Sequence, residues 1–197
     1  MFLWVRLVEG LLSPGKNAKQ LWKAVSEIPI GLEKTYRREL QIILDLSSDE
    51  KDRAIVILRW TLFAAQPLAV RELTEALIID IDSSTTYPFD DLPDVWDEYY
   101  VNNQIRRLRG SLIDIRGSEP EDSVANHTIH FVHSSVKEFL SNHIGSNVKC
   151  DIFFSRASSE HGLLARVCLS YVCYDDIMKE YKSTAKNLQE KIECVQT

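Results

Sequence analysis

The sequence predicts a mainly α-helical fold that contains one small β-hairpin. Apolar residues recur at helical spacing along most of the 197 residues, while only two short segments, 112–116 and 127–133, alternate in polarity as strands do. Hydrophobic residues make up 45% of the chain, which is enough to build a buried core. We therefore expect a helical domain closed by a hairpin, with further helical segments on either side.

The first helix of this domain should follow Gly31, and a second should follow a capping serine. The apolar stripe of the first helix consists of Leu32, Tyr36, Leu40 and Ile43. Ser47 and Glu50 have the spacing of a capping box, in which a hydroxyl and a carboxylate satisfy backbone amides at a helix start. The stripe of the second helix consists of Ile55, Leu58 and Leu62. Pro67 should end this helical region, because its ring has no amide hydrogen.

Two shorter helices follow, separated by an acidic loop. The stripe of the first consists of Val70, Leu73 and Leu77. The loop, 80–100, is rich in Asp, Ser, Thr and Pro and is expected to be mobile. The stripe of the second short helix consists of Ile105, Leu108 and Leu112.

The hairpin joins its two strands through the polar turn 117–126. Behind it, Ser135 and Glu138 repeat the capping-box spacing and predict a helix with Val136, Phe139 and Leu140 on its apolar face. Three helices, a hairpin and a closing helix is the order of a winged-helix domain. Two helical stripes come after it, first Leu164, Val167, Cys168 and Tyr171, and then Ile177, Tyr181, Leu188 and Ile192.

Composition argues against several classes of function. With a net charge of −6, the chain has no excess of Lys and Arg to neutralise nucleic-acid or membrane phosphates. No segment has the length of a membrane span, and the N-terminus lacks the basic region of a signal peptide. The four cysteines have no metal-ligand spacing, so buried reduced thiols are expected. A cytoplasmic protein that binds neither nucleic acid nor membrane fits these features best.

The stretch 10–16, GLLSPGK, has the spacing of a Walker A phosphate loop, so a divergent P-loop NTPase is one alternative. Asn17 stands where such a loop needs a hydroxyl for magnesium, and Pro14 removes one backbone amide. Asp80 ends an apolar run as a Walker B aspartate does, but this run continues a helical stripe. Only helices are predicted between Asn17 and Asp80, whereas a P-loop fold requires several parallel strands. No nucleotide cofactor is expected at this motif.

Several segments resemble the region downstream of the NACHT NTPase core in fungal STAND proteins, which are NLR-like and often end in ankyrin or WD repeats. The segments are FLWVRLVEGLL (2–12), EIPIGLEKTYRREL (27–40), RAIVILRWTLFAAQPLAVRELTEALIID (53–80) and IHFVHSSVKEFL (129–140). The central part is similar to the winged-helix domain of that region, which is also labelled after GPI inositol-deacylase. SSEHGLLARVCLSYVCYDD (158–176) resembles the helical segment that leads toward the repeats.

The resemblance implies three parts: a helical remnant of the NTPase module in 1–30, a winged-helix domain in 31–146, and a helical extension in 147–197. It implies a non-catalytic regulatory role, in which the winged helix couples the nucleotide state of a parent NTPase to signalling. The partners would be proteins, such as the parent's NTPase and repeat domains. The stretch 10–16 then becomes a helix end. No G-x-S-x-G elbow is present, so the deacylase label implies no hydrolase activity.

His127, His130 and His133 invite a metal-site hypothesis. Side chains alternate along a strand, so His127 and His133 share one face while His130 points away, and no metal site is expected. By resemblance, His133 corresponds to a histidine that contacts a bound phosphate in the inactive, nucleotide-bound state of some STAND proteins. A structural role within the hairpin is the alternative for this residue.

Arg106, Arg107 and Arg109 lie on the predicted third helix, which is the recognition helix of DNA-binding winged-helix proteins. A DNA-binding regulator is therefore a further alternative, and a solvated face paired with the acidic loop is the simpler interpretation. The partner-binding candidates are Trp96 in the loop and, in the C-terminal stripe, Ile177, Tyr181 and Leu188. Such a stripe would fold back or self-associate, and Trp96 could instead pack in a cluster under the loop.

Overall fold

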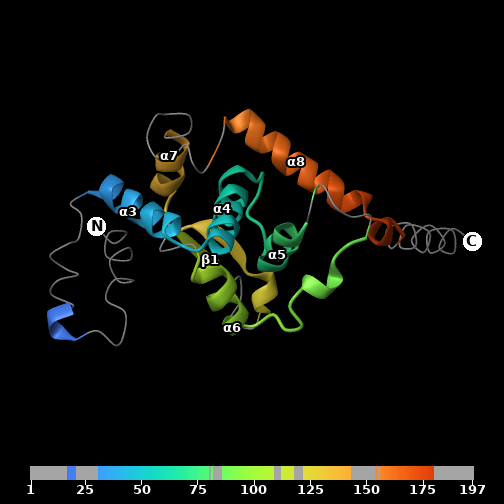
Figure 1. The fold of residues 1–197 in the computed structure, drawn as a ribbon, viewed down its shortest axis with the longest axis horizontal. Coiled ribbons are helices and arrows are strands. Elements are labelled where there is room, and N and C mark those ends of the chain that lie inside the picture. The colour runs from blue at the N-terminus through green and yellow to red at the C-terminus, as the bar shows by residue number, and fades with distance from the viewer. Residues whose placement is uncertain are drawn as a thin grey trace, which may run out of the picture.

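The structure, a computed structural model, covers most of the predicted winged-helix region and the helix that follows it. The described residues are 17–20, 31–79, 81, 86–108, 112–117, 122–142, 154 and 156–179. Within them the fold is mainly α-helical with one small antiparallel hairpin (Figure 1), as the sequence predicts. Of the part predicted as an NTPase remnant, 1–30, the structure describes only residues 17–20.

The first two helices of the domain are α3 (Leu32–Leu44) and α4 (Ser48–Phe63). Gly31 precedes α3 with φ of 102°, a left-handed conformation that glycine adopts without steric cost. Ser47 is the residue before α4, as predicted, but its hydroxyl donates to the Glu50 carboxylate over 2.8 Å. Ser47 and Glu50 therefore bond to each other, and the Ser47 hydroxyl does not accept the predicted hydrogen bond from a backbone amide.

A third, strand-like segment lies beside the two strands of the hairpin, and the sequence did not reveal it. β1 (Ile113–Arg116) pairs antiparallel with β2 (Thr128–Phe131). On the other side of β2, the Leu68 carbonyl accepts from the Ile129 amide over 2.9 Å. The His127 carbonyl accepts from the Val70 amide over 2.8 Å. The short segment between α4 and α5 (Val70–Ile78) thus ties both helices to the hairpin.

The third helix begins earlier than predicted. It consists of α6 (Glu98–Val101), which continues into a π-helical turn, η3 (Asn102–Arg106). Asp97 caps it, because its carboxylate accepts from the Tyr100 amide over 2.8 Å. This start lies inside the segment predicted as loop. Leu112, placed in the helix by its spacing, instead lies just before β1, although it is fully buried.

The described part of the acidic loop is anchored, against the expectation of mobility. It contains a short 3₁₀ helix, η2 (Phe89–Asp91). Tyr87 is buried and makes edge-to-face ring contacts with Phe89, Tyr171 and Tyr174, at centroid distances of 4.7, 5.6 and 5.4 Å. These contacts fix the loop to the end of α8 (Ala157–Cys173).

After a 3₁₀ turn, η4 (Val124–Asn126), and β2, the chain enters α7 (Ser134–Asn142). α8 then packs across α4 (Figure 1). It buries Leu164 and Val167 as predicted, but Cys168 and Cys173 are exposed, so the expectation of buried thiols is wrong for these two. Residues 175–179 form a further helical turn.

One hydrophobic core unites these elements. Its fully buried side chains include Ile43, Ile57, Leu58, Val70, Ile105, Leu112, Ile113 and Val136. These residues come from the helices and from the hairpin, so the domain folds around a single centre. In the part of the chain that the structure describes, no helix is long and apolar enough to cross a membrane.

Candidate functional site

The most distinctive polar hollow of the domain lies between the end of α4, strand β2 and the start of α7. Its volume is about 230 Å³. The lining residues are Thr61, Ala64, Ala65, Gln66, Pro67, Ile129, His130, Phe131, His133, Ser134 and Lys137. None of these described lining residues carries a carboxylate, although the chain has a net charge of −6. The hollow is thus a locally basic site in an acidic protein.

His133 stands at the rim of this hollow, immediately before α7. Its ring atom Nδ1 accepts from the Ser135 amide over 3.1 Å, and its carbonyl accepts from the Val136 amide over 3.1 Å. His133 therefore caps α7 by satisfying amides that a helix start leaves without partners. The predicted capping box of Ser135 with Glu138 is wrong in this respect, because the Ser135 side chain turns elsewhere.

The Ser135 hydroxyl connects His133 to a tyrosine in α3. Its Oγ lies 2.8 Å from His133 Nδ1 and 2.8 Å from the Tyr36 hydroxyl. Burial raises the pKa of Tyr36, and the nearby Glu138 raises it further, while the hydrogen bond with Ser135 partly opposes this. The Tyr36 ring also packs against Phe139, with centroids 5.3 Å apart. A polar chain thus links α3 to the capping histidine.

His130 lines the same hollow from β2. Its Nε2 lies 2.8 Å from the Thr128 hydroxyl. Burial lowers the pKa of His130, the Arg116 guanidinium lowers it further, and the cross-strand Asp114 opposes both. The ring is therefore neutral near pH 7 and can serve as a hydrogen-bonding group.

The three histidines do not meet. β2 extends only from Thr128 to Phe131, so His127 and His133 flank the strand. The His127 ring instead approaches Gly117 so closely that a Cβ atom there would lie 2.5 Å from its Nε2. Among the described residues, no group of three side chains of metal-ligand type converges.

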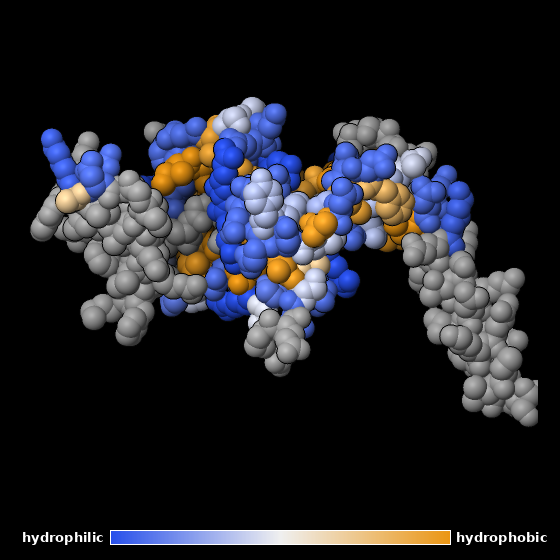
Figure 2. All heavy atoms as spheres, turned by 90° about the horizontal axis from the view of Figure 1, so that it is seen from below, coloured by the Kyte–Doolittle hydropathy of each residue, from blue (hydrophilic) through white to orange (hydrophobic). Residues whose placement is uncertain are grey.

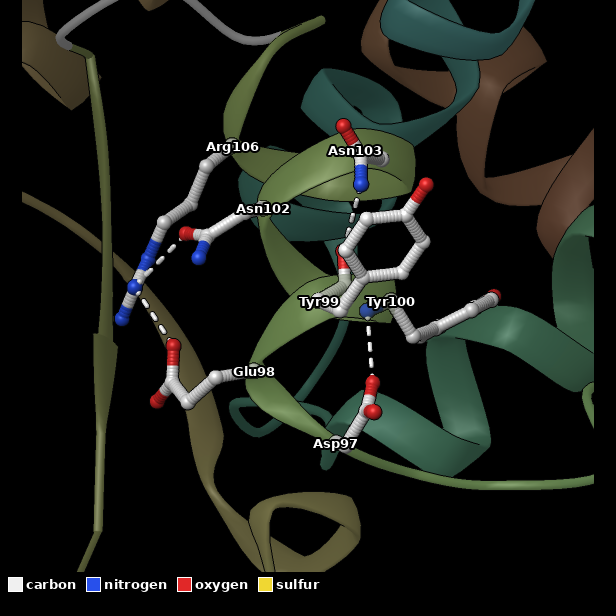
Figure 3. A network of polar contacts seen from close by, with 7 residues as sticks. All are labelled: Asp97, Glu98, Tyr99, Tyr100, Asn102, Asn103 and Arg106. Carbon is white, nitrogen blue, oxygen red and sulfur yellow. Dashed lines mark hydrogen bonds and ion pairs between the residues drawn. The ribbon is translucent and has the colours of Figure 1, made fainter.

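Arg106 and Arg107 of the third helix are each paired with a carboxylate, and Figure 3 shows the pairing of Arg106. Arg106 donates to Glu98 over 2.8 Å and to Asn102 over 2.9 Å. Arg107 donates to Glu50 of α4 over 2.8 Å. Glu98 belongs to the segment 80–100 that the sequence predicted as the acidic loop, so Arg106 pairs with that loop as suggested, whereas Arg107 pairs with α4. Arg109 lies outside the described residues.

The partner-binding candidates fall into different surroundings. Trp96 is half-buried and packs against the Tyr100 ring, with centroids 5.6 Å apart, while Ile177 is half-buried in the helical turn after α8. Tyr181 and Leu188 lie outside the described residues. Among the described residues, the large apolar side chains with the highest exposed fractions are Tyr99 at 77%, Leu169 at 65% and Val95 at 64%. Apolar patches are visible on an otherwise mostly hydrophilic face (Figure 2).

The phosphate-loop motif also falls largely outside the described residues, which exclude 10–16. Asn17 is described, and its side chain accepts from the Gln20 amide while its own amide donates to Gln20, each over 2.9 Å. Asn17 therefore caps a helical turn at 18–20. The run before Asp80 belongs to helix α5 up to Ile78, and no strand occurs in the described stretch 31–79 apart from the short pairing at Ala69.

Comparison with known proteins agrees with this architecture. A family profile described as "GPI inositol-deacylase, winged helix domain" matches residues 42–153, which is more than half of the chain. A curated relative, "Azaphilone pigments biosynthesis cluster protein L" of Monascus ruber, is 27% identical over 158 residues. The alignment covers 80% of this chain but 31% of the relative, so the chain spans about a third of that protein's length. No solved structure matches the chain.

The matched range contains most of the elements described above, from α4 through the hairpin to α7, together with the hollow at His133. Their order and packing are those of a winged helix, and the profile match supplies the family. The chain therefore belongs to the GPI inositol-deacylase winged-helix domain family.

Proposed function

We propose that this chain is a non-catalytic regulatory winged-helix module of a fungal NACHT/STAND protein of the NLR-like type. In this role it couples the nucleotide state of an NTPase module to signalling in the cytoplasm. Membership of the winged-helix family and the resemblance of residues 2–176 to the region after a NACHT core support the proposal. In this role His133 contacts a phosphate group. That phosphate would belong to a nucleotide held by the NTPase module, and this chain would contact it from outside.

The observation that carries the proposal is the basic hollow at His133. The His133 ring and the Lys137 ammonium line it, together with the first residue of α7, Ser134, and no carboxylate is among the described lining residues. A helix start with adjacent cationic or N–H-donating side chains favours anions such as phosphate. These surroundings support the proposed contact of His133 with the phosphate of a neighbouring module.

Coupling follows from the way this site is attached to the rest of the molecule. Its polar chain reaches α3 on the N-terminal side through Tyr36. On the C-terminal side, α8 is joined to α4 by the Arg59–Glu160 ion pair. A module fastened on both sides turns as a rigid body, so gaining or losing a phosphate contact would reorient both flanking segments.

The protein partners of this module would be the NTPase and repeat domains of the same parent. Self-association through the C-terminal stripe is part of the proposal, because Ile177 is half-buried at the start of this stripe and Tyr181 and Leu188 continue it in the sequence. Light scattering of the full chain with and without Leu188→Asp tests this part. A dimer that dissociates in the variant supports it, and a monomer in both overturns it.

Titration of the ¹⁵N-labelled chain with inorganic pyrophosphate tests the phosphate contact. We expect saturable amide shifts at the start of α7 and around His133, weakened at least several-fold by His133→Gln and by Lys137→Met. Lys34→Met is the matched control, since Lys34 is exposed on α3 away from the hollow. Shifts that are absent, or that are equally strong in all three variants, would contradict the proposal.

A further inference from the structure

We propose that Ser135 and Tyr36 are positioning residues that hold the neutral His133 ring in the tautomer with its proton on Nε2. This inference rests on the proposed function and extends it, because the tautomer determines whether the ring can donate a hydrogen bond to a phosphate oxygen. Neither residue lines the hollow, so each acts only through His133.

The His133 ring faces the protein with its Nδ1 atom. The Ser135 amide donates to His133 Nδ1 over 3.1 Å, and an N–H group can donate only to a ring nitrogen that carries no hydrogen. Ser135 is the second residue of α7, where the amide has no acceptor within the helix. The tautomer with the proton on Nε2 satisfies this amide, and the opposite tautomer would leave it without its acceptor.

The hydrogen bonds that run through the Ser135 hydroxyl then have a defined direction. Because Nδ1 carries no hydrogen in this tautomer, the Ser135 hydroxyl, 2.8 Å away, can only donate to it, and it shares the single Nδ1 lone pair with the Ser135 amide. That donation uses the single hydroxyl hydrogen of Ser135. The Tyr36 hydroxyl, 2.8 Å from Ser135 Oγ, must then be the donor to Ser135.

A tyrosine at position 36 is suited to donate the hydrogen bond to Ser135. Tyr36 is 2% exposed, and burial keeps its phenol protonated by raising its pKa, so the group remains a donor. Reversing the chain would require Tyr36 to accept from Ser135 and the ring to donate from Nδ1. The reversed arrangement loses the bond from the Ser135 amide, so the direction from Tyr36 through Ser135 to His133 is favoured.

The consequence is a specific ligand chemistry for the exposed side of the ring. With Nδ1 engaged, Nε2–H is a donor, which suits an oxygen of a phosphate group and does not suit a metal ion or a cationic ligand. The hydrogen bonds from Tyr36 through Ser135 also make this donor depend on the position of α3. A displacement of α3 that withdraws Tyr36 would weaken the preference for this tautomer and hence the phosphate contact.

The test is ¹⁵N NMR of the histidine rings in the full chain, at about pH 8, where a histidine of ordinary pKa is neutral. The His133 signals are assigned by their loss in His133→Gln. We expect Nδ1 of His133 to show the chemical shift of an unprotonated ring nitrogen and Nε2 that of a protonated one. In Ser135→Ala and Tyr36→Phe both signals should move toward the average of two exchanging tautomers, with the larger change in Ser135→Ala.

Ser135→Thr, which keeps the hydroxyl, should restore the wild-type shifts, and Ser141→Ala, at an exposed serine of α7 that does not line the hollow, is the control. A wild-type ring with the proton on Nδ1, or shifts unchanged in both Ser135→Ala and Tyr36→Phe, would overturn the inference. Pyrophosphate titration of the same samples separates the two claims. Correct tautomers without pyrophosphate binding would refute the proposed function and leave the positioning role intact.

Discussion

Arg59 in α4 and Glu160 in α8 form an ion pair of 2.7 Å, with side chains only 18% and 5% exposed. The pair lies between the winged-helix core and the helix that leaves it. Next to it, the Phe63 ring contacts Phe154 and His161 edge-to-face. The position of α8 on the domain is therefore set by a charged contact as well as by apolar burial.

Glu160→Gln should lower the free energy of unfolding by about 3 kcal/mol, because Arg59 is left mostly buried without its carboxylate. The double variant Arg59→Met/Glu160→Leu should lose much less, since it removes both charges and retains side-chain volume. Urea unfolding of the three proteins measures the difference. A loss of less than about 1 kcal/mol in the single variant would place this contact with ordinary surface ion pairs.

Tyr87→Phe should leave stability unchanged or raise it by up to about 1 kcal/mol. No described residue accepts a hydrogen bond from the buried Tyr87 hydroxyl, so its removal relieves the cost of a polar group without a partner. Tyr87→Ala should instead cost about 3–5 kcal/mol, because the ring anchors the loop against Tyr171 and Tyr174. Thermal unfolding of both variants provides the comparison. A destabilised Tyr87→Phe would contradict the prediction, because it would show that the Tyr87 hydroxyl makes a stabilising hydrogen bond.

His130 should make the domain less stable in acid. Burial and Arg116 lower its pKa in the folded state, so the unfolded chain binds the proton more tightly. The free energy of unfolding should fall as pH drops below about 6.5, the ordinary histidine value, and level off below the lowered folded-state pKa. In His130→Asn this part of the pH dependence should vanish. If His130→Asn instead lost stability more steeply than the wild type in acid, folding would have to raise the pKa of His130 and not lower it.

Arg106→Ala and Arg107→Ala should change neither DNA affinity nor stability appreciably. Each arginine is paired with a carboxylate, in Glu98 and Glu50, so little free positive charge is available for phosphates. Exposed pairs of this kind contribute about 0–1 kcal/mol. Fluorescence anisotropy with a mixed-sequence duplex at low salt should show only weak binding that is equal in all three proteins. Tight, salt-dependent binding lost in both variants would favour the DNA-binding alternative.

The helices could be predicted because burial follows the helical period. Tyr36, Leu40 and Ile43 are all buried on α3, as their spacing indicates. The same argument fails for α8, where Val167 is buried and Cys168 beside it is exposed. This helix carries apolar residues on both sides, as the exposed Leu169 shows, so periodicity alone does not determine which side packs.

Other features were hidden because they depend on contacts between distant segments. The segment at Leu68 pairs with β2 over only two residues, and its position after Pro67 looked like a simple break. Ser135 matched a helix-capping pattern, yet its hydroxyl joins His133 to Tyr36, which is 99 positions away in the sequence. His133 itself could be selected by resemblance, whereas the carboxylate-free lining of its hollow required the three-dimensional arrangement.

The central claim is that this winged helix works beside a nucleotide-binding module in one protein. The most direct measurement is the 5′ end of the native transcript, together with the reading frame upstream of Met1. We expect an in-frame segment that encodes a phosphate loop of the form G-x-x-x-x-G-K-[ST]. A transcript that starts just upstream of Met1, with a stop codon in frame before it, would contradict the account and leave a stand-alone winged helix.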